Sequence, residues 1–233
     1  MNDYGRSGPK DGNWSRYGAV ESLDALVEEF TLRKDRSFTF VIDNMDKDET
    51  AKQLDASTAL ARQLRQVVIP EIDTYVYGVM AANAGTKPEA VELTKENIYE
   101  QILKASKALD DALVPEERRV LVVTPETYRI MKLNDEIIMN TDIGAEERKK
   151  GVISCLDGAN VLKIPATRLP QGFGFMLAHP CATVAPVKLD SHRIHIDPPG
   201  INGTLTEGRF VYDAFVLENK ALAIYYQATT ATS

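Results

Sequence analysis

The stretch LARQLRQVVIPEIDTYVYGVMAANAG, residues 60–85, carries the strongest structural signal in this chain of 233 residues. Apolar or weakly polar residues recur there and just upstream at steps of three and four, the pattern of a helix with one buried stripe. They are Leu54, Thr58, Ala61, Leu64, Val68, Ile72, Tyr75 and Val79. A helix from about residue 48 to residue 83 would be roughly 54 Å long at 1.5 Å per residue. Because a compact domain of this size rarely needs so long a helix, we expect an elongated spine.

Three local signals set the expected limits of this spine. Pro70 lacks a backbone N–H, so the sequence predicts a kink or break around residues 67–69. Gly85 is expected to end the helix. Asp46 and Glu49 have the spacing of a capping box, which predicts that a helix begins there.

The region before the spine predicts a loop and then a strand. In residues 36–42 the aromatic and aliphatic side chains at positions 38, 40 and 42 would share one face, which indicates a strand with one packed side. Residues 1–20 are rich in Gly and polar side chains and predict a loop or long arm. Because such an arm cannot bury its own Trp14 and Tyr17, we expect it to pack on something else.

The middle of the chain predicts a mixed lobe. Thr94 is expected to cap a helix that ends before Pro115 and that buries apolar positions at helical spacing, namely Ile98, Ile102, Ala105, Leu109 and Leu113. The continuous apolar run 120–123 predicts a strand covered on both faces. Thr124 and the proline after it predict a short helix to about Leu133.

The last third changes from helix to sheet. The expected strands are 160–164, 174–179, 182–189, 193–197, 209–217 and 221–227. Residues 217–221 form a short polar link between the last two, which suggests an antiparallel hairpin. The whole therefore predicts an α+β protein.

Composition excludes several classes of protein. With 44% hydrophobic and 26% charged residues the chain is neither disordered nor fibrous, and its length suits one large domain or two small ones. The net charge of −7 disfavours a primary role in binding nucleic acid, because an acidic surface repels phosphate. Only two cysteines and no long apolar run indicate a protein of a reducing compartment, neither exported nor membrane-spanning.

Candidate catalytic residues are few. Cys155 and His179 could form a thiolate and base pair, but nothing local marks the cysteine as a nucleophile. His192 and His195 lie three apart in a predicted strand and would point to opposite faces, which disfavours a shared metal. The acids of residues 43–49 are explained better as helix caps than as a calcium loop. We therefore expect no catalytic site, no cofactor and no metal.

Three segments carry a resemblance to a known family. DYGRSGPKDGNW (3–14) with LRKDRSFTFVIDNMDKDET (32–50), the helix segment 60–85, and GRFVYDAFVLENKALAIYYQ (208–227) together resemble major capsid proteins of tailed bacteriophages, which share the Hong Kong 97-like fold with encapsulins. The resemblance implies an extended loop, a peripheral domain built on the spine helix, and an axial domain. It implies domain ranges of 1–46 for the partial extended loop and return strand, 47–93 with 182–233 for the peripheral domain, and 94–181 for the axial domain.

The same resemblance implies a function in assembly. Such a subunit tiles pentamers and hexamers into an icosahedral shell around double-stranded DNA, with copies of itself as its main partner, and with scaffolding or portal proteins as further partners. It would reside in the virion, and in the bacterial host cytoplasm before assembly. The alternatives are an encapsulin-like compartment shell and, from another class, a small cytoplasmic enzyme that uses Cys155 and His179.

Intersubunit contacts are expected from seven residues that match the loop tip and its return. These are Tyr4, Arg6, Trp14, Arg36, Asp43, Asp46 and Glu49. Arginine at such positions can form bidentate pairs with a neighbour's carboxylates. Family members have an N-terminal arm and an outgoing strand before the loop tip, whereas Met1 here falls near the tip itself. The return strand would then lack a partner and expose backbone groups, and residues 1–35 would be displaced, flexible or paired with a neighbouring chain.

Overall fold

The computed structural model describes residues 28–49, 55–134, 136–137, 153 and 155–230. The chain divides into two compact units, Met1–Thr31 and Leu32–Ser233, and the elements below all belong to the second. The predicted arm of residues 1–20 and most of the polar segment near residue 145 lie outside the described residues.

The spine is helical from Ala56 to Ala82. It comprises α2 (Ala56–Gln63), a π turn η1 (Leu64–Val68) and α3 (Ile69–Ala82), and is about 40 Å long at 1.5 Å per residue. The expected start near residue 48 is wrong: the acidic segment forms a separate short helix α1 (Asn44–Glu49). The spine is instead capped by Asp55, whose carboxylate accepts hydrogen bonds from the backbone N–H groups of Ser57 and Thr58.

The irregularity expected at Pro70 is present in a milder form. The π turn lies immediately before the proline, and the backbone stays helical through it rather than breaking. Pro70 would leave the carbonyl of residue 66 without its usual donor, and a wider turn accommodates this. The helix ends at Ala82, three residues before Gly85. Gly85 instead allows a close approach of two backbone segments, because a Cβ there would lie 2.5 Å from the carbonyl carbon of Ala221.

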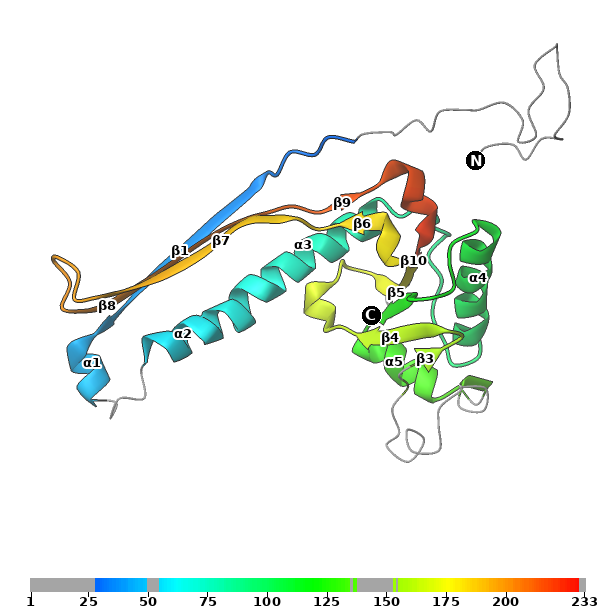
Figure 1. Cartoon of the computed structure of the whole chain (residues 1–233). Coiled ribbons are helices and arrows are strands. Elements are labelled where there is room, and N and C mark those ends of the chain that lie inside the picture. Colours follow the sequence, from blue (N-terminus) through cyan, green and yellow to red (C-terminus); the bar gives the residue numbers. More distant parts are fainter. Residues whose placement is uncertain (1–27, 50–54, 135, 138–152, 154, 231–233) are drawn as a thin grey trace, which may run out of the picture. The chain divides into compact units, whose positions relative to one another are not determined.

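A three-stranded antiparallel sheet packs along the spine (Figure 1). Its order is β1-β8-β7, from β1 (Lys34–Asp43), β8 (Gly203–Tyr212) and β7 (Val187–Ile196). The predicted alternation in β1 is confirmed, since positions 38, 40 and 42 are less exposed than the positions between them. Buried Phe210 and Tyr212 of β8 pack on Val68 of the spine, with half-buried neighbours around them.

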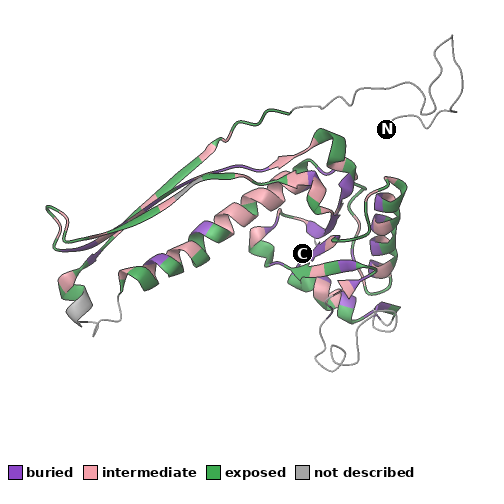
Figure 2. Ribbon diagram, in the orientation of Figure 1, coloured by how far each residue is buried: buried purple, intermediate pink, exposed green. Residues whose placement is uncertain are grey.

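The mixed lobe has a five-stranded sheet with order β10-β5-β2-β4-β3. Its strands are β2 (Val120–Val123), β3 (Cys155–Leu156), β4 (Ala159–Lys163), β5 (Phe173–Ala178) and β10 (Ile224–Ala228). The predicted strand 120–123 is confirmed as the central one, with three of its four residues buried. Purple segments on the lobe in Figure 2 mark this core.

Two helices cover this lobe. In α4 (Ile98–Asp111) four of the five predicted positions are buried, but Leu113 lies beyond the helix at a positive φ and is exposed. The predicted cap Thr94 is wrong by one turn, because Asn97 occupies the N-cap position. Helix α5 (Pro125–Lys132) begins as predicted, with the Thr124 hydroxyl accepting a hydrogen bond from the backbone N–H of Thr127.

The late strands differ from prediction in their connections. The two strands expected at 182–189 and 193–197 form β6 (Thr183–Val184) and one long β7, and the expected hairpin at residues 217–221 is wrong. That link is a 3-10 helix, η4 (Glu218–Ala223), between β9 (Phe215–Val216), which pairs with β6, and β10, which pairs with β5. Strand β10, which falls in the range expected for the peripheral domain, thus pairs with β5, which falls in the range expected for the axial domain. The rest of the domain division stays a prediction.

Candidate assembly surface

Strand β1 presents an open edge. It pairs with β8 on one side, and within the described part of the chain no strand lies on its other side. Residues 37–42 of this edge contain no charge, proline or glycine, so nothing in them opposes pairing with another strand. The opposite edge strand, β7, is protected differently, because it has a bulge near Lys188 and carries charged residues such as Arg193.

A groove of about 1180 Å³ lies between the beginning of β1 and helix α3. Small or short side chains of α3 line it at every fourth position, namely Pro70, Thr74, Gly78 and Ala82. A Cβ added to Gly78 would meet no atom within 4 Å, so the groove is open above that residue. On its other side Arg168 of η2 (Ala166–Arg168) forms an ion pair with Asp73, with Nη1 and Oδ2 3.0 Å apart.

Arg36 binds within its own chain at the side of this groove. Its Nε lies 2.7 Å from Oε1 of Glu71 on α3, and the hydroxyl of Tyr212 donates to the same oxygen at 3.2 Å. Burial, followed by the charge and hydrogen bond of Glu71, raises the pKa of Tyr212 to about 12. Tyr212 is therefore a neutral hydrogen-bond donor over the physiological range.

Arg36→Ala is expected to lower the free energy of unfolding by less than about 1 kcal/mol, because the arginine side chain is 58% exposed and solvent screens the pair. Chemical denaturation of the two proteins measures this difference. Arg36→Lys is the matched control, since it retains the charge but loses the fork. A loss well above 1 kcal/mol would show that Arg36 is chiefly a structural residue.

Asp213 joins the beginning of β1 to the spine. Its carboxylate accepts hydrogen bonds from the Tyr75 hydroxyl (2.7 Å) and from the backbone N–H groups of Arg33 (2.9 Å) and Ala214 (2.8 Å). Burial alone would raise the pKa of Asp213, but these hydrogen bonds outweigh it and lower the pKa below its usual value. The side chain is almost fully buried and ionised, and it holds three segments together.

The far end of β1 is acidic and carries an exposed apolar residue. Asp43 ends the strand, and its Oδ1 accepts a hydrogen bond from the backbone N–H of Met45 at 2.8 Å. The side chain of Met45 is 68% exposed. Asn44 fixes α1 to the turn after β7, because its Nδ2 donates to Oδ1 of Asp197 and to Oδ1 of Asn202, both at 3.1 Å.

The predicted contact residues fall into three groups. Tyr4, Arg6 and Trp14 lie outside the described residues. Arg36 is at the groove, at the beginning of β1, whereas Asp43, Asp46 and Glu49 are at or beyond the end of the strand, the last two within α1. The two described groups are thus at opposite ends of β1, and their role between subunits stays a prediction. Sequence reasoning missed Asp213 and Gly78, since no local motif marks either.

The alternative catalytic pair is not assembled. Cys155 pairs with Asn160, Asn160 with Val120, and Val120 with Ala178, which precedes His179. Three strand spacings separate the two residues, or about 14 Å. The side chain of His179 accepts a hydrogen bond from the backbone N–H of Cys181 instead.

The two strand histidines have different neighbours in the sheet. Nε2 of His195 lies 3.2 Å from Oε1 of Glu207, whereas His192 is paired with Gly208 in the sheet. Among the described residues no group of three or more His, Cys, Asp or Glu side chains could hold a metal ion. In the same part of the chain, no helix is both long and apolar enough to span a bilayer.

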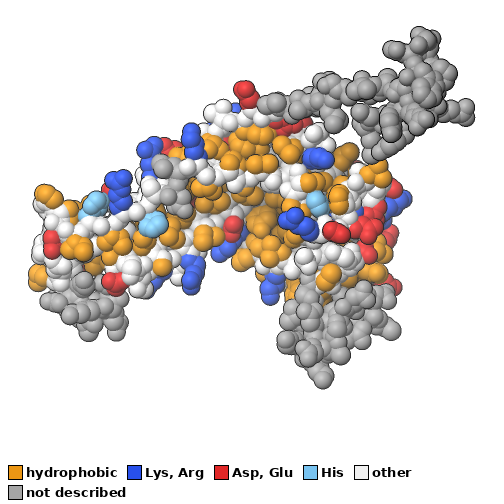
Figure 3. Space-filling model, viewed as in Figure 1, with side chains coloured by type: hydrophobic (Ala, Val, Ile, Leu, Met, Phe, Trp, Pro, Cys, Tyr) orange, Lys and Arg blue, Asp and Glu red, His pale blue; other side chains and the backbone are white. Residues whose placement is uncertain are grey.

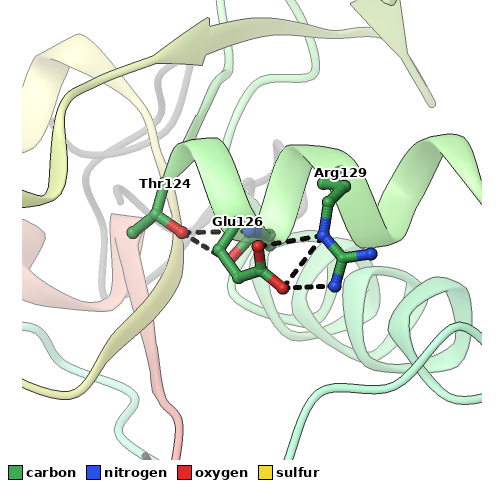
Figure 4. A network of polar contacts seen from close by, with 4 residues as sticks. Thr124, Glu126 and Arg129 are labelled. Carbon is green, nitrogen blue, oxygen red and sulfur yellow. Dashed lines mark hydrogen bonds and ion pairs between the residues drawn. The ribbon is translucent and has the colours of Figure 1, made fainter.

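A second groove of about 1010 Å³ lies at the beginning of α5. Figure 4 shows the Glu126 carboxylate facing the Arg129 guanidinium, with distances of 2.5–3.1 Å, while Thr124 caps the helix. The hydrogen bonds of Arg129, followed by its charge, lower the pKa of Glu126. Glu126 and Arg129 therefore neutralise each other at this groove.

Figure 3 shows apolar side chains exposed over a broad central area of one face of the molecule, with charged groups around it.

Comparison with solved structures identifies the fold. A structure from Mycobacterium phage Che8 matches 83% of this chain and 70% of its own, with a TM-score of 0.68 and 20% identity. The capsid of Cyanophage P-SCSP1u matches 92% and 81%, with a TM-score of 0.69 and 14% identity. The mature capsid of bacteriophage PhiM1 matches 100% and 81%, with a TM-score of 0.67 and 12% identity.

Other comparisons are weaker. The SrpI encapsulin from Synechococcus elongatus matches 86% of this chain and 75% of its own, with a TM-score of only 0.50 and 12% identity. No protein-family model matches the sequence, and no curated protein matches it. The spine, the sheet along it and the mixed lobe thus have the arrangement of the phage capsid structures, and this chain has the α+β fold of tailed-phage major capsid proteins.

Proposed function

We propose that this protein is a structural subunit of a phage or prophage capsid, and that copies of it assemble into an icosahedral shell around double-stranded DNA. The observation that carries the proposal is the open edge of β1, uncharged over residues 37–42, on a chain with the phage capsid fold. A monomeric protein normally blocks such an edge with charge, proline or a bulge. The edge is therefore suited to contact between subunits.

Charge supports a passive relation to the packaged DNA. The net charge of −7 gives the shell little affinity for phosphate, so the shell can enclose DNA without binding it tightly. The protein would reside in the virion, and in the host cytoplasm before assembly, where scaffolding or portal proteins are further partners. The lower similarity to an encapsulin makes a compartment shell the second candidate. Nuclease-protected DNA inside particles isolated from the native phage or host would separate a capsid from such a compartment.

The direct test is assembly of the full chain. We expect light scattering and electron microscopy to show shells, or species the size of pentamers and hexamers, in equilibrium with monomer. Val41→Lys adds a charge at the open edge and should reduce assembly at equal concentration, since Val41 is 48% exposed and its loss leaves the core intact. Leu162→Lys, at a comparably exposed position elsewhere, is the matched control. A protein that stays smaller than a pentamer at every concentration would contradict the proposal.

A further inference from the structure

The link between β7 and β8 ends in Asn202, and this is the one position in the sequence where glycine follows asparagine. Asn202 is exposed and lies outside any helix or strand, whereas Gly203 is buried and begins β8. A backbone nitrogen can attack the side-chain carbonyl carbon of the asparagine before it. Glycine offers the least hindered nitrogen for this attack, because it has no Cβ.

The hydrogen bonds of Asn202 favour the same reaction. Nδ2 of Asn44 donates to Oδ1 of Asn202 at 3.1 Å, and this oxygen takes up negative charge when a nucleophile adds to Cγ. The donor is therefore already directed at the atom where charge develops. Among the described residues no hydrogen bond holds Nδ2 of Asn202, the nitrogen that would leave.

Conversion of Asn202 to an acid would bring two carboxylates to one amide. Nδ2 of Asn44 also donates to Oδ1 of Asp197, again at 3.1 Å. Because both oxygens lie 3.1 Å from the same nitrogen, they are within about 6 Å of each other. This separation is shorter than the Debye length of about 8 Å at physiological ionic strength, so a second carboxylate at position 202 would repel Asp197.

The bonds of Asn44 attach α1 to the link between β7 and β8 (Figure 1). Besides its side chain, the backbone N–H of Asn44 donates to the carbonyl oxygen of Asn202 at 3.2 Å. An isoaspartate at position 202 would add one carbon to the main chain at this point. There is little space for it, because even a Cβ on Gly203 would collide with the carbonyl oxygen of Ile42. Either acidic product therefore weakens the attachment of α1.

We propose that Asn202 and Gly203 form a self-modification site, at which deamidation of Asn202 releases α1 from the link between β7 and β8. The backbone nitrogen of Gly203 loses its proton to hydroxide and bonds to Cγ of Asn202. The bond from Cγ to Nδ2 then breaks, and Nδ2 takes up a proton from water and leaves as ammonia. Water opens the resulting cyclic imide at either carbonyl, which gives aspartate or isoaspartate. The reaction consumes one water and needs only the folded chain, so it is independent of the proposed function.

Peptide mass spectrometry of the full chain, aged at mildly alkaline pH, tests the site. Trypsin releases residues 194–209, in which Asn202 is the only asparagine. We expect deamidation there to be about tenfold faster than at Asn83 and Asn219, a difference in barrier of about 1.4 kcal/mol. Those two asparagines are also exposed, but the residues that follow them carry side chains.

The rate at Asn202 should rise with pH, because the attacking nitrogen must lose a proton. Asn202→Gln is the matched variant, and its residue 202 should stay unmodified over the same period because its longer side chain would have to form a larger ring. Equal rates at Asn202, Asn83 and Asn219 in the folded protein would overturn the site.

Hydrogen exchange tests the release of α1. Asn202→Asp supplies the aspartate product in every molecule. We expect the backbone N–H of Asn44 to exchange about two- to fivefold faster at low salt, the range expected for repulsion between exposed charges. High salt should reduce the difference because it screens the repulsion. Adding Asp197→Asn should restore normal exchange, since asparagine tolerates the positive φ of that position.

Two results would overturn the release of α1. The first is unchanged exchange at Asn44, both in aged protein that carries the modification and in Asn202→Asp. The second is faster exchange that persists when Asp197→Asn is added to Asn202→Asp, because a single carboxylate would then be enough and repulsion would not be the cause.

Discussion

Asp213→Ala is expected to lower the free energy of unfolding by about 3 kcal/mol, the largest effect of a single side chain near the groove. The substitution leaves the Tyr75 hydroxyl and the backbone N–H groups of Arg33 and Ala214 without their acceptor, and hydrogen bonds to a charged group contribute about 1.5–3 kcal/mol each before compensation. Urea denaturation followed by circular dichroism measures the loss. Tyr75→Phe removes one of the three bonds and should cost about 1 kcal/mol.

The contribution of Asp213 should also depend on pH. Its pKa is lower in the folded protein than in the unfolded chain, so the stabilisation is complete above the unfolded pKa of about 3.9 and is lost as the pH falls through the folded value. Asp213→Asn cannot titrate, and the difference in stability between it and the wild type should shrink as acid is added. A difference that stays constant from neutral to acidic pH would contradict the ionised state of this carboxyl.

Arg119→Ala is expected to destabilise the mixed lobe by about 1–3 kcal/mol, because it leaves buried carbonyl groups without their donor, whereas its ionic partner Asp110 is 50% exposed and stays solvated. The guanidinium is 3% exposed, and its Nη2 lies 2.7 Å from Oδ1 of Asp110 and 2.6 Å from the carbonyl oxygen of Val114. Its Nε also donates to the carbonyl of Pro115 at 3.0 Å. Loss of the side chain releases the link between α4 and β2, which contains two residues at positive φ, Leu113 and Arg118.

The neighbouring Arg118 provides the control for this prediction. Arg118 is exposed and has a positive φ, a conformation that asparagine tolerates. The substitution Arg118→Asn should therefore change the free energy of unfolding by less than about 0.5 kcal/mol. Thermal melting of both variants gives the comparison. If Arg119→Ala melts like Arg118→Asn, the buried guanidinium does not stabilise the link.

Elements with local causes were predictable from the sequence. The alternation of β1 and the apolar run of β2 both follow from the faces that a strand must bury, and α5 follows from the threonine cap and first-turn proline. The start of the spine was placed wrongly because the acidic segment around Asp46 forms a short helix of its own, whereas the spine begins after Asp55, which caps it. The expected hairpin at residues 217–221 failed because β10 finds its partner in β5, more than 40 residues away.

The candidate surface was less predictable than the fold. The sequence indicated Arg36 and the acids near residue 46, but not that β1 would hold them at opposite ends. Asp213 follows a strand with no motif around it, and its importance arises only when Tyr75, 138 positions away, reaches it. From the sequence, Gly78 is only a residue that destabilises a helix, and its place at the open groove is seen only in the structure.

The π turn has a consequence for engineering and for the comparison of homologous chains. A π turn accommodates one residue more than an α turn, so each residue upstream is rotated by about 100° relative to an uninterrupted helix. Deleting one residue within Leu64–Val68 would restore a regular helix while swinging buried Leu60 away from its present direction. Alignments that omit a gap at this point would pair inward-facing with outward-facing positions along α2.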